Sequence, residues 1–194
     1  MGKIDESELI KRVKNGDLDA FSELVGRYEK KAFNFTYRML KDAHTAEDVT
    51  QEAFLRVFRK IETLKENSSF STWFYTILNN ICLDYLRKKS RYPDTVSIGQ
   101  KSADDEEYEL QIEDNSIGPH ESLEKKEAMA LLEKALDKLS DEHRAIIILR
   151  DIEGRDYEEI AKILSISLGT VKSRLSRARL ALRKFLEEEK ELFR

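Results

Sequence analysis

The chain has 194 residues, 37% of them charged, and a formal net charge of −4. This length suits one domain or two small ones, and the scarcity of Pro (2) and Gly (7) favours an all-α fold over a sheet. No alternating Val/Ile/Thr-rich runs are present, which supports the same interpretation. With no long apolar run, no signal peptide and Cys82 as its one cysteine, the chain is expected in the reducing cytoplasm, without membrane insertion, a disulfide or a cysteine-based zinc site.

The charge is distributed unevenly along the chain. Residues 91–120 hold eight acids against two bases, a net of −6, which leaves +2 for the rest of a chain whose total is −4. Because this stretch also contains both prolines and lacks helical periodicity, we expect an acidic flexible linker between two small helical domains, 1–90 and 121–194. The acidic cluster 104–107 lacks turn glycines and spaced ligands, so neither a metal nor another cofactor is expected.

The first domain is expected to open with a short helix over 7–14 and a longer helix ending near Leu40. Thr45 is then expected to cap a third helix over 46–61. One face of that third helix combines acids, an amide, an arginine and a leucine: Asp48, Gln51, Glu52, Leu55 and Arg59. Such a mixed stripe can dock a partner protein, and the alternative is an ordinary solvated face.

A fourth helix is expected over 71–89, after a polar loop at 63–69. Its inner face includes Cys82, which we interpret as a small buried hydrophobe and not a reactive thiol. The opposite face carries Trp73, Thr76, Asn80 and Arg87, with Asp84 beside them, followed by further basic residues. Stacking surface, amide and cations together suit single-stranded nucleic acid, although Trp73 could equally be a core residue.

The second domain is expected to contain four helices, of which the last two form a helix-turn-helix over 157–184. Ser165 to Ser167 interrupts the helical pattern, and Ser167 is a plausible N-cap for the final helix. That helix has an apolar stripe made of Val171, Leu175, Ala178 and Leu182. Its other side is rich in Ser, Arg and Lys, with six basic residues and no acid from 168 to 184. This pattern suits the DNA major groove, and the alternative is a solvated basic face.

Several strings together resemble the extracytoplasmic-function group of bacterial sigma factors, the subunits that give RNA polymerase its promoter specificity. In the first half they are NGDLDAFSELVGRY, AEDVTQEAFLRVFRKI and FSTWFYTILNN. In the second half the resemblance covers the stretch from LSDEHRAIIILRDIEG to the end of the helix-turn-helix, and GTVKSRLSRAR is its most specific part. The resemblance implies an alternative sigma factor that responds to envelope or other external stress.

The resemblance also implies roles for individual residues. Those expected at the promoter −35 element are Thr170, Lys172, Ser173, Arg174, Ser176 and Arg177. Those expected to open the −10 element and hold its single strand, including a flipped base, are Asn67, Ser68, Trp73, Thr76, Asn80, Asp84 and Arg87. Those expected to dock on the clamp coiled coil of the largest subunit of core RNA polymerase are Asp48, Gln51, Glu52 and Leu55. An anti-sigma factor is a further expected partner.

Two other classes of function fit the sequence less well. An ordinary helix-turn-helix regulator fits the second half, but the first half lacks the alternating strand and helix pattern and the phosphoacceptor arrangement of a receiver domain. An enzyme is not expected, because the three histidines are not paired at metal-ligand spacing. The sequence also lacks a phosphate-binding glycine loop and a nucleophile elbow.

Overall fold

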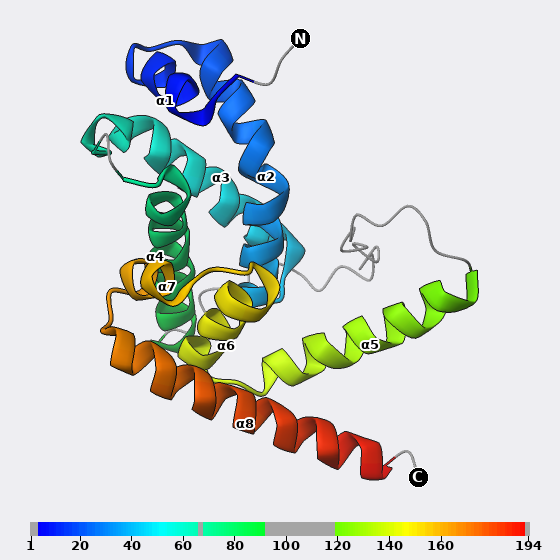
Figure 1. The fold of residues 1–194 in the computed structure, drawn as a ribbon. Helices are drawn as coiled ribbons and strands as arrows, with labels where there is room; N and C mark the ends of the chain where they lie inside the picture. Colours follow the sequence, from blue (N-terminus) through cyan, green and yellow to red (C-terminus); the bar gives the residue numbers. More distant parts are fainter. Residues whose placement is uncertain (1–3, 66–67, 92–118, 193–194) are drawn as a thin grey trace. The chain divides into compact units, whose positions relative to one another are not determined.

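The computed structural model describes residues 4–65, 68–91 and 119–192, and all the regular structure in these ranges is helical (Figure 1). The elements in chain order are α1 (Glu6–Lys14), α2 (Leu18–Leu40), α3 (Ala43–Lys60), a 3₁₀ turn η1 (Ile61–Thr63), α4 (Phe70–Arg91), α5 (Pro119–Asp137), α6 (Asp141–Ile147), a π turn η2 (Ile148–Ile152), α7 (Tyr157–Leu164) and α8 (Leu168–Leu192). The expected all-α fold is therefore confirmed.

Two compact units are present among the described residues, one formed by α1–α4 and the other containing α5, α6 and α8. Most of the expected acidic linker lies outside the described residues, so its flexibility and the domain borders at 90 and 120 stay predictions. No described helix combines the length and the apolar character that crossing a bilayer requires.

The first three helices of the first unit, α1 to α3, begin at aspartate caps. The side chains of Asp5 and Asp17 accept hydrogen bonds from the backbone N–H groups of Ser7 and Ala20, at 3.2 and 3.0 Å. The third helix begins earlier than expected, because Asp42 and not Thr45 is its cap. Asp42 has an extended backbone, and its carboxylate accepts the N–H of Thr45 at 2.7 Å. Aspartate is at least as good an N-cap as threonine, so it initiates the helix three residues upstream.

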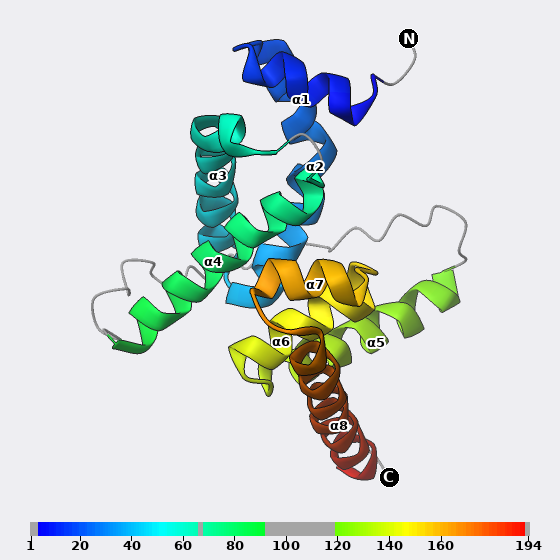
Figure 2. The same ribbon diagram turned by 60° about the vertical axis from the view of Figure 1, so that its left-hand side comes forward.

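An aromatic cluster fills the core of the first unit, where α2 packs against α3 and α4 (Figures 1 and 2). Phe74 is fully buried, and its ring centroid lies 5.0 Å from that of Phe54 and 5.9 Å from that of Phe70. Tyr75 meets Phe35 edge to face at 5.5 Å. Such aromatic pairs stabilise the core by about 0.5–1.5 kcal/mol each beyond the apolar area that they bury.

The predicted burial of Cys82 is confirmed, since its side chain is inaccessible to solvent. Burial raises the pKa of the Cys82 thiol to about 12, and a hydrogen bond with Thr36 opposes this shift only in part. Thr36 is itself buried and donates its hydroxyl hydrogen to the carbonyl of Ala32 at 2.8 Å. The thiol is therefore held neutral at physiological pH and is not a nucleophile.

In the second unit, the buried guanidinium of Arg144 caps the carboxyl end of α5. Its Nε donates to the carbonyl of Leu136 at 3.0 Å, and its Nη2 donates to the carbonyls of Leu139 and Asp137 at 3.3 and 3.4 Å. The last carbonyls of a helix have no partner within the helix, so a cation with several N–H donors suits this place. One side chain thus ties α6 to the end of α5.

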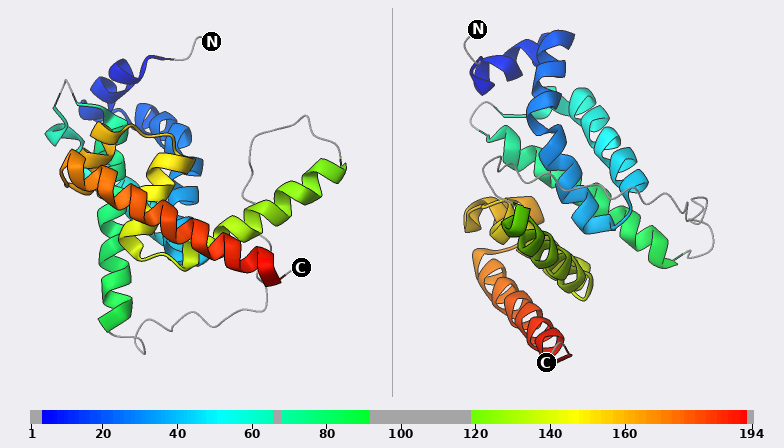
Figure 3. Two further views of the ribbon diagram at one scale, coloured as in Figure 1. Left: turned by 60° about the horizontal axis from the view of Figure 1, so that its bottom comes forward. Right: turned by 90° about the vertical axis from the view of Figure 1, so that its right-hand side faces the viewer.

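The final two helices are joined by a tight turn, as the sequence predicts. Ser165 has a left-handed backbone, with φ 53°, and the N–H of Ile166 returns to the carbonyl of Ala161 at 3.0 Å. The hydroxyl of Ser167 accepts the N–H of Thr170 at 3.1 Å, which confirms Ser167 as the N-cap of α8. Within the second unit, α8 packs against α6 and also contacts α5 (Figure 3).

Candidate nucleic-acid and partner-binding surfaces

The amino-terminal half of α8 presents two different sides. Val171, Leu175 and Ala178 are buried, at 0, 2 and 0% exposure, and anchor the helix. The side chains opposite this stripe are exposed, namely Lys172, Ser173, Ser176 and Arg177. Thr170 is half-buried beside the cap. The sequence therefore predicted correctly which of these residues face solvent, and the four exposed ones form one polar, cationic surface.

Hydrogen bonds along α8 order part of this surface. Ser173 donates its hydroxyl hydrogen to the carbonyl of Thr170 at 3.2 Å, while Arg177 donates from Nε to the carbonyl of Ser173 at 3.3 Å and from Nη2 to its hydroxyl at 3.4 Å. Each serine hydroxyl keeps lone pairs, and each guanidinium has five N–H donors in all. The surface can therefore offer both donors and acceptors to base edges or phosphates.

Arg174 differs from the other residues expected to contact DNA. Its side chain is 24% exposed, and its Nη2 lies 3.3 Å from Oε2 of Glu142 at the start of α6. Arg179, five residues further along, donates from Nε to Oδ2 of Asp151 at 3.1 Å, and its Nη2 contacts Oδ1 of the same carboxylate. These hydrogen bonds raise the pKa of Arg179. Two arginines of α8 are thus paired with carboxylates of the preceding elements.

The expected surface for single-stranded DNA lies along α4. Trp73 is half-buried, with its ring centroid 6.0 Å from that of Phe70, so it is neither a full core residue nor a free platform. Thr76 is half-buried as well, and Asn80 is exposed. Asp84 and Arg87 are exposed and form an ion pair at 3.4 Å. In the preceding loop Ser68 is exposed, whereas Asn67 lies outside the described residues.

The expected docking face on α3 is accessible. Leu55 is 50% exposed, and Gln51 and Asp48 are exposed one and two turns before it, respectively. Glu52 is less accessible because its carboxylate accepts a hydrogen bond from Nε of Arg56 at 2.7 Å. Sequence reasoning missed two further exposed apolar side chains in this unit. Phe58 is 43% exposed and meets the ring of Phe21 at 5.0 Å, and Leu18 is 63% exposed near the start of α2.

The part of the chain that the structure describes holds no group of three or more His, Cys, Asp or Glu side chains able to bind a metal. Sequence reasoning also overlooked the burial of Asn79, which is 1% exposed although it adjoins the exposed Asn80. Helical spacing indicates this burial, because residue 79 falls on the same face as the buried Cys82.

Comparison with known protein families places both units in one group. Residues 24–92 match Sigma-70 region 2, and residues 129–182 match Sigma-70 region 4. The chain is similar to the ECF RNA polymerase sigma factor SigW of Bacillus subtilis, with 39% identity over 92% of this chain and 95% of the relative. It is also similar to the ECF RNA polymerase sigma-E factor of Escherichia coli, with 32% identity over 93% of each chain.

Two solved structures are also similar to this chain. The sigma factor RpoE of Bartonella quintana, determined in complex with the anti-sigma factor NepR, is 25% identical and has a TM-score of 0.65, covering 86% of this chain and 96% of that one. CnrH, determined in complex with the cytosolic domain of CnrY, has a TM-score of 0.69 at 21% identity and covers 94% and 97% of the two chains. At that identity the likeness to CnrH supports the fold alone.

Proposed function

Because the chain belongs to the extracytoplasmic-function group of RNA polymerase sigma factors, we propose that it binds core RNA polymerase and directs transcription from promoters that it selects by their −35 and −10 elements. The observation that carries this proposal is the two-sided α8. Its apolar stripe is buried, and its opposite side exposes two cations and two hydroxyls after a well-formed helix cap.

For the −35 element, Lys172, Ser173, Ser176 and Arg177 are the residues that we assign to base and phosphate contacts, with Thr170 beside them. A helix of this kind enters the major groove with its amino-terminal half, where Arg and Lys reach guanine acceptors and Ser serves either role. A good base-specific contact contributes about 1–3 kcal/mol of discrimination.

For the −10 element, the α4 surface holds the separated strand. The exposed Asn80 offers an amide to base edges, Arg87 follows the phosphates, and the accessible part of Trp73 supports stacking. Asn67, Ser68, Thr76 and Asp84 complete this group. Extracting a base from its stack costs a few kcal/mol, so a preformed pocket favours the bases whose contacts within it offset that free energy.

Core polymerase docks, in this proposal, on the α3 face defined by Asp48, Gln51, Glu52 and Leu55, against the clamp coiled coil of the largest subunit. Phe58 lies three residues after Leu55 in α3 and supplies further exposed apolar area beside it. Neighbouring exposed apolar side chains rimmed by polar residues are typical of a docking surface, whereas a single exposed one is common on any protein.

The chain acts by binding and has no catalytic activity of its own in this scheme. The sigma factor RpoE of Bartonella quintana was determined in complex with an anti-sigma factor, which supports an anti-sigma partner for this chain too. A cytoplasmic location follows from acting on RNA polymerase, and the absence of a spanning helix among the described residues fits it.

The deciding experiment mixes the full chain with core RNA polymerase from Bacillus subtilis. We expect stoichiometric co-elution, followed by initiation at promoters selected from a pool randomised over the −35 hexamer. Lys172→Ala and Arg177→Ala should each weaken selection at one or two positions of that hexamer. Lys30→Ala, on the exposed surface of α2, is the matched control for removing a cation. Tight DNA binding by the chain alone, with no binding to polymerase, would replace this proposal with a conventional regulator.

A further inference from the structure

The paired basic residues of α8 differ in where their carboxylate partners lie. Arg183 and Lys184 pair with Glu187 and Glu188 of the same helix, at 2.7 and 3.9 Å. Arg174 and Arg179, by contrast, pair with carboxylates outside α8. An ion pair within one helix moves with that helix, whereas a pair between elements restrains one element against another. Only the second kind can control how α8 is oriented in its unit.

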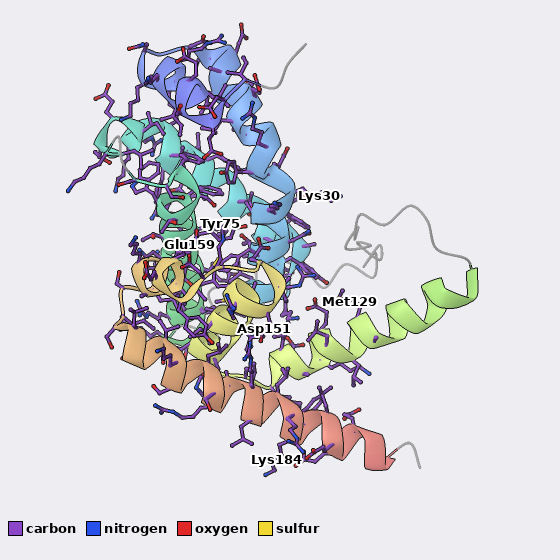
Figure 4. The ribbon with its side chains drawn as sticks, viewed as in Figure 1. Lys30, Tyr75, Met129, Asp151, Glu159 and Lys184 are labelled. Atoms are coloured by element: carbon purple, nitrogen blue, oxygen red, sulfur yellow. The ribbon has the colours of Figure 1, made fainter. Side chains whose placement is uncertain are left out.

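The two outside pairs lie on opposite flanks of the buried stripe. At about 100° per residue, Arg174 and Arg179 fall about 70° to either side of the stripe formed by Val171, Leu175 and Ala178. Their partners also belong to different elements. Glu142 lies in the first turn of α6, and Asp151 lies in the π turn that follows it (Figure 4 labels Asp151).

We propose that Glu142 and Asp151 are positioning residues for promoter recognition, and this inference rests on the function proposed above. By holding α8 from both flanks they fix its rotation about its own axis. That rotation determines which direction the four exposed residues face, namely Lys172, Ser173, Ser176 and Arg177. Arg174 and Arg179 then orient the recognition surface and are not themselves contacts to DNA.

Packing alone fixes this rotation less tightly. The buried stripe ends in Ala178, a small side chain, and in the next turn Leu182 is only half-buried. The Arg179 pair joins two N–H donors to the two oxygens of Asp151, and this fork geometry restrains both the position and the angle of a guanidinium. The π turn brings Asp151 to this position, and π turns in helices are frequently found at functional sites.

The test uses full-length protein with Bacillus subtilis core polymerase and two templates, a promoter selected from the randomised pool and the same promoter with a scrambled −35 hexamer. The measured quantities are the ratio of initiation on the two templates and, for each template, the dependence of the binding constant on salt concentration. We expect Asp151→Asn and Arg179→Gln each to lower the ratio roughly three- to five-fold, the size expected for a partly exposed pair with good geometry. The double variant should be no worse than either single one, because both remove the same pair.

The salt dependence separates positioning from direct contact. If Arg179 touched a phosphate, Arg179→Gln would weaken binding to both templates alike. The slope of log binding constant against log salt concentration would then become flatter by about one, while Asp151→Asn would leave binding intact. That pattern would overturn the inference. Glu142→Gln provides an independent variant on the other flank, with the same expected loss of ratio at an unchanged slope.

Glu187→Gln is the matched control, because it removes a carboxylate that pairs within α8, and it should leave the ratio unchanged. Exchanging the charges in the variant carrying both Asp151→Arg and Arg179→Asp should recover part of the lost preference, and no recovery would contradict a positioning role. If the wild-type chain shows no −35 preference with polymerase, the proposed function fails and this inference fails with it. If the wild type selects the hexamer and Asp151→Asn and Glu142→Gln select it equally well, only the positioning role is wrong.

Discussion

Replacing Arg144 with methionine should destabilise the second unit specifically. Methionine approximates the length of the side chain but removes every donor, so the carbonyls of Leu136, Leu139 and Asp137 lose their hydrogen bonds. The ion pair with Asp141, at 3.7 Å and with Asp141 45% exposed, adds little. A hydrogen bond from a charged donor contributes about 1.5–3 kcal/mol, and removing one partner from a buried arrangement costs about 3–5 kcal/mol. Because two of the three bonds are long, we expect a loss of about 3 kcal/mol.

The single tryptophan makes this loss measurable unit by unit. Trp73 belongs to the first unit, so its fluorescence follows that unit, while far-ultraviolet circular dichroism follows both. In urea, the dichroism of Arg144→Met should show an early transition, roughly 2–3 M below that of wild type, with the Trp73 midpoint unchanged. Arg177→Met is the control, because that side chain is exposed in the same unit. A loss below about 1 kcal/mol, or an equal shift of the Trp73 midpoint, would refute the assignment of Arg144 as the cap of α5.

Three further predictions concern the first unit. Burial raises the pKa of Cys82 to about 12, so iodoacetamide at pH 8 should label the thiol only in urea, which mass spectrometry would check. The contribution of the neutral thiol to stability should be complete below about pH 9 and lost as the pH rises toward 12, which alkaline unfolding would check. Asp42→Ala should cost about 1 kcal/mol in the Trp73 unfolding transition, with Asp42→Asn closer to wild type. Hydrogen bonds with Thr45 lower the pKa of Asp42, so that cap should weaken as the pH falls through the lowered value. Leu55→Asp should leave the unfolding midpoint unchanged but reduce co-elution with core polymerase, and equal co-elution would remove the α3 face from the docking proposal.

Local chemistry explains what the sequence could predict of the fold. The limits expected for α7 agree with the structure because the apolar spacing ends at Leu164 and a serine-rich turn follows. Thr45 was the wrong cap because both it and Asp42 have suitable side chains, and only the backbone conformation distinguishes them. The π turn after α6 was not predicted, since an apolar run there is compatible with an ordinary helix as well.

The candidate DNA surface was predictable where one helix determines it. Spacing alone separates the buried Val171 from the exposed Ser173 and Arg177, because they lie on opposite sides of α8. Arg174 falls at the border of the two sides, where spacing cannot say whether a side chain turns toward DNA or toward a neighbouring element. Its partner Glu142 lies 32 positions earlier, and only tertiary packing reveals such a distant partner.

The pairing of cations along α8 has a consequence for the protein when polymerase is absent. Of the six basic residues between 168 and 184, Lys172 and Arg177 alone have no carboxylate partner in the part of the chain that the structure describes. Attraction to arbitrary DNA grows with the number of phosphates neutralised, because each one releases counterions. We therefore expect α8 to contribute little sequence-independent affinity for DNA before the chain meets polymerase.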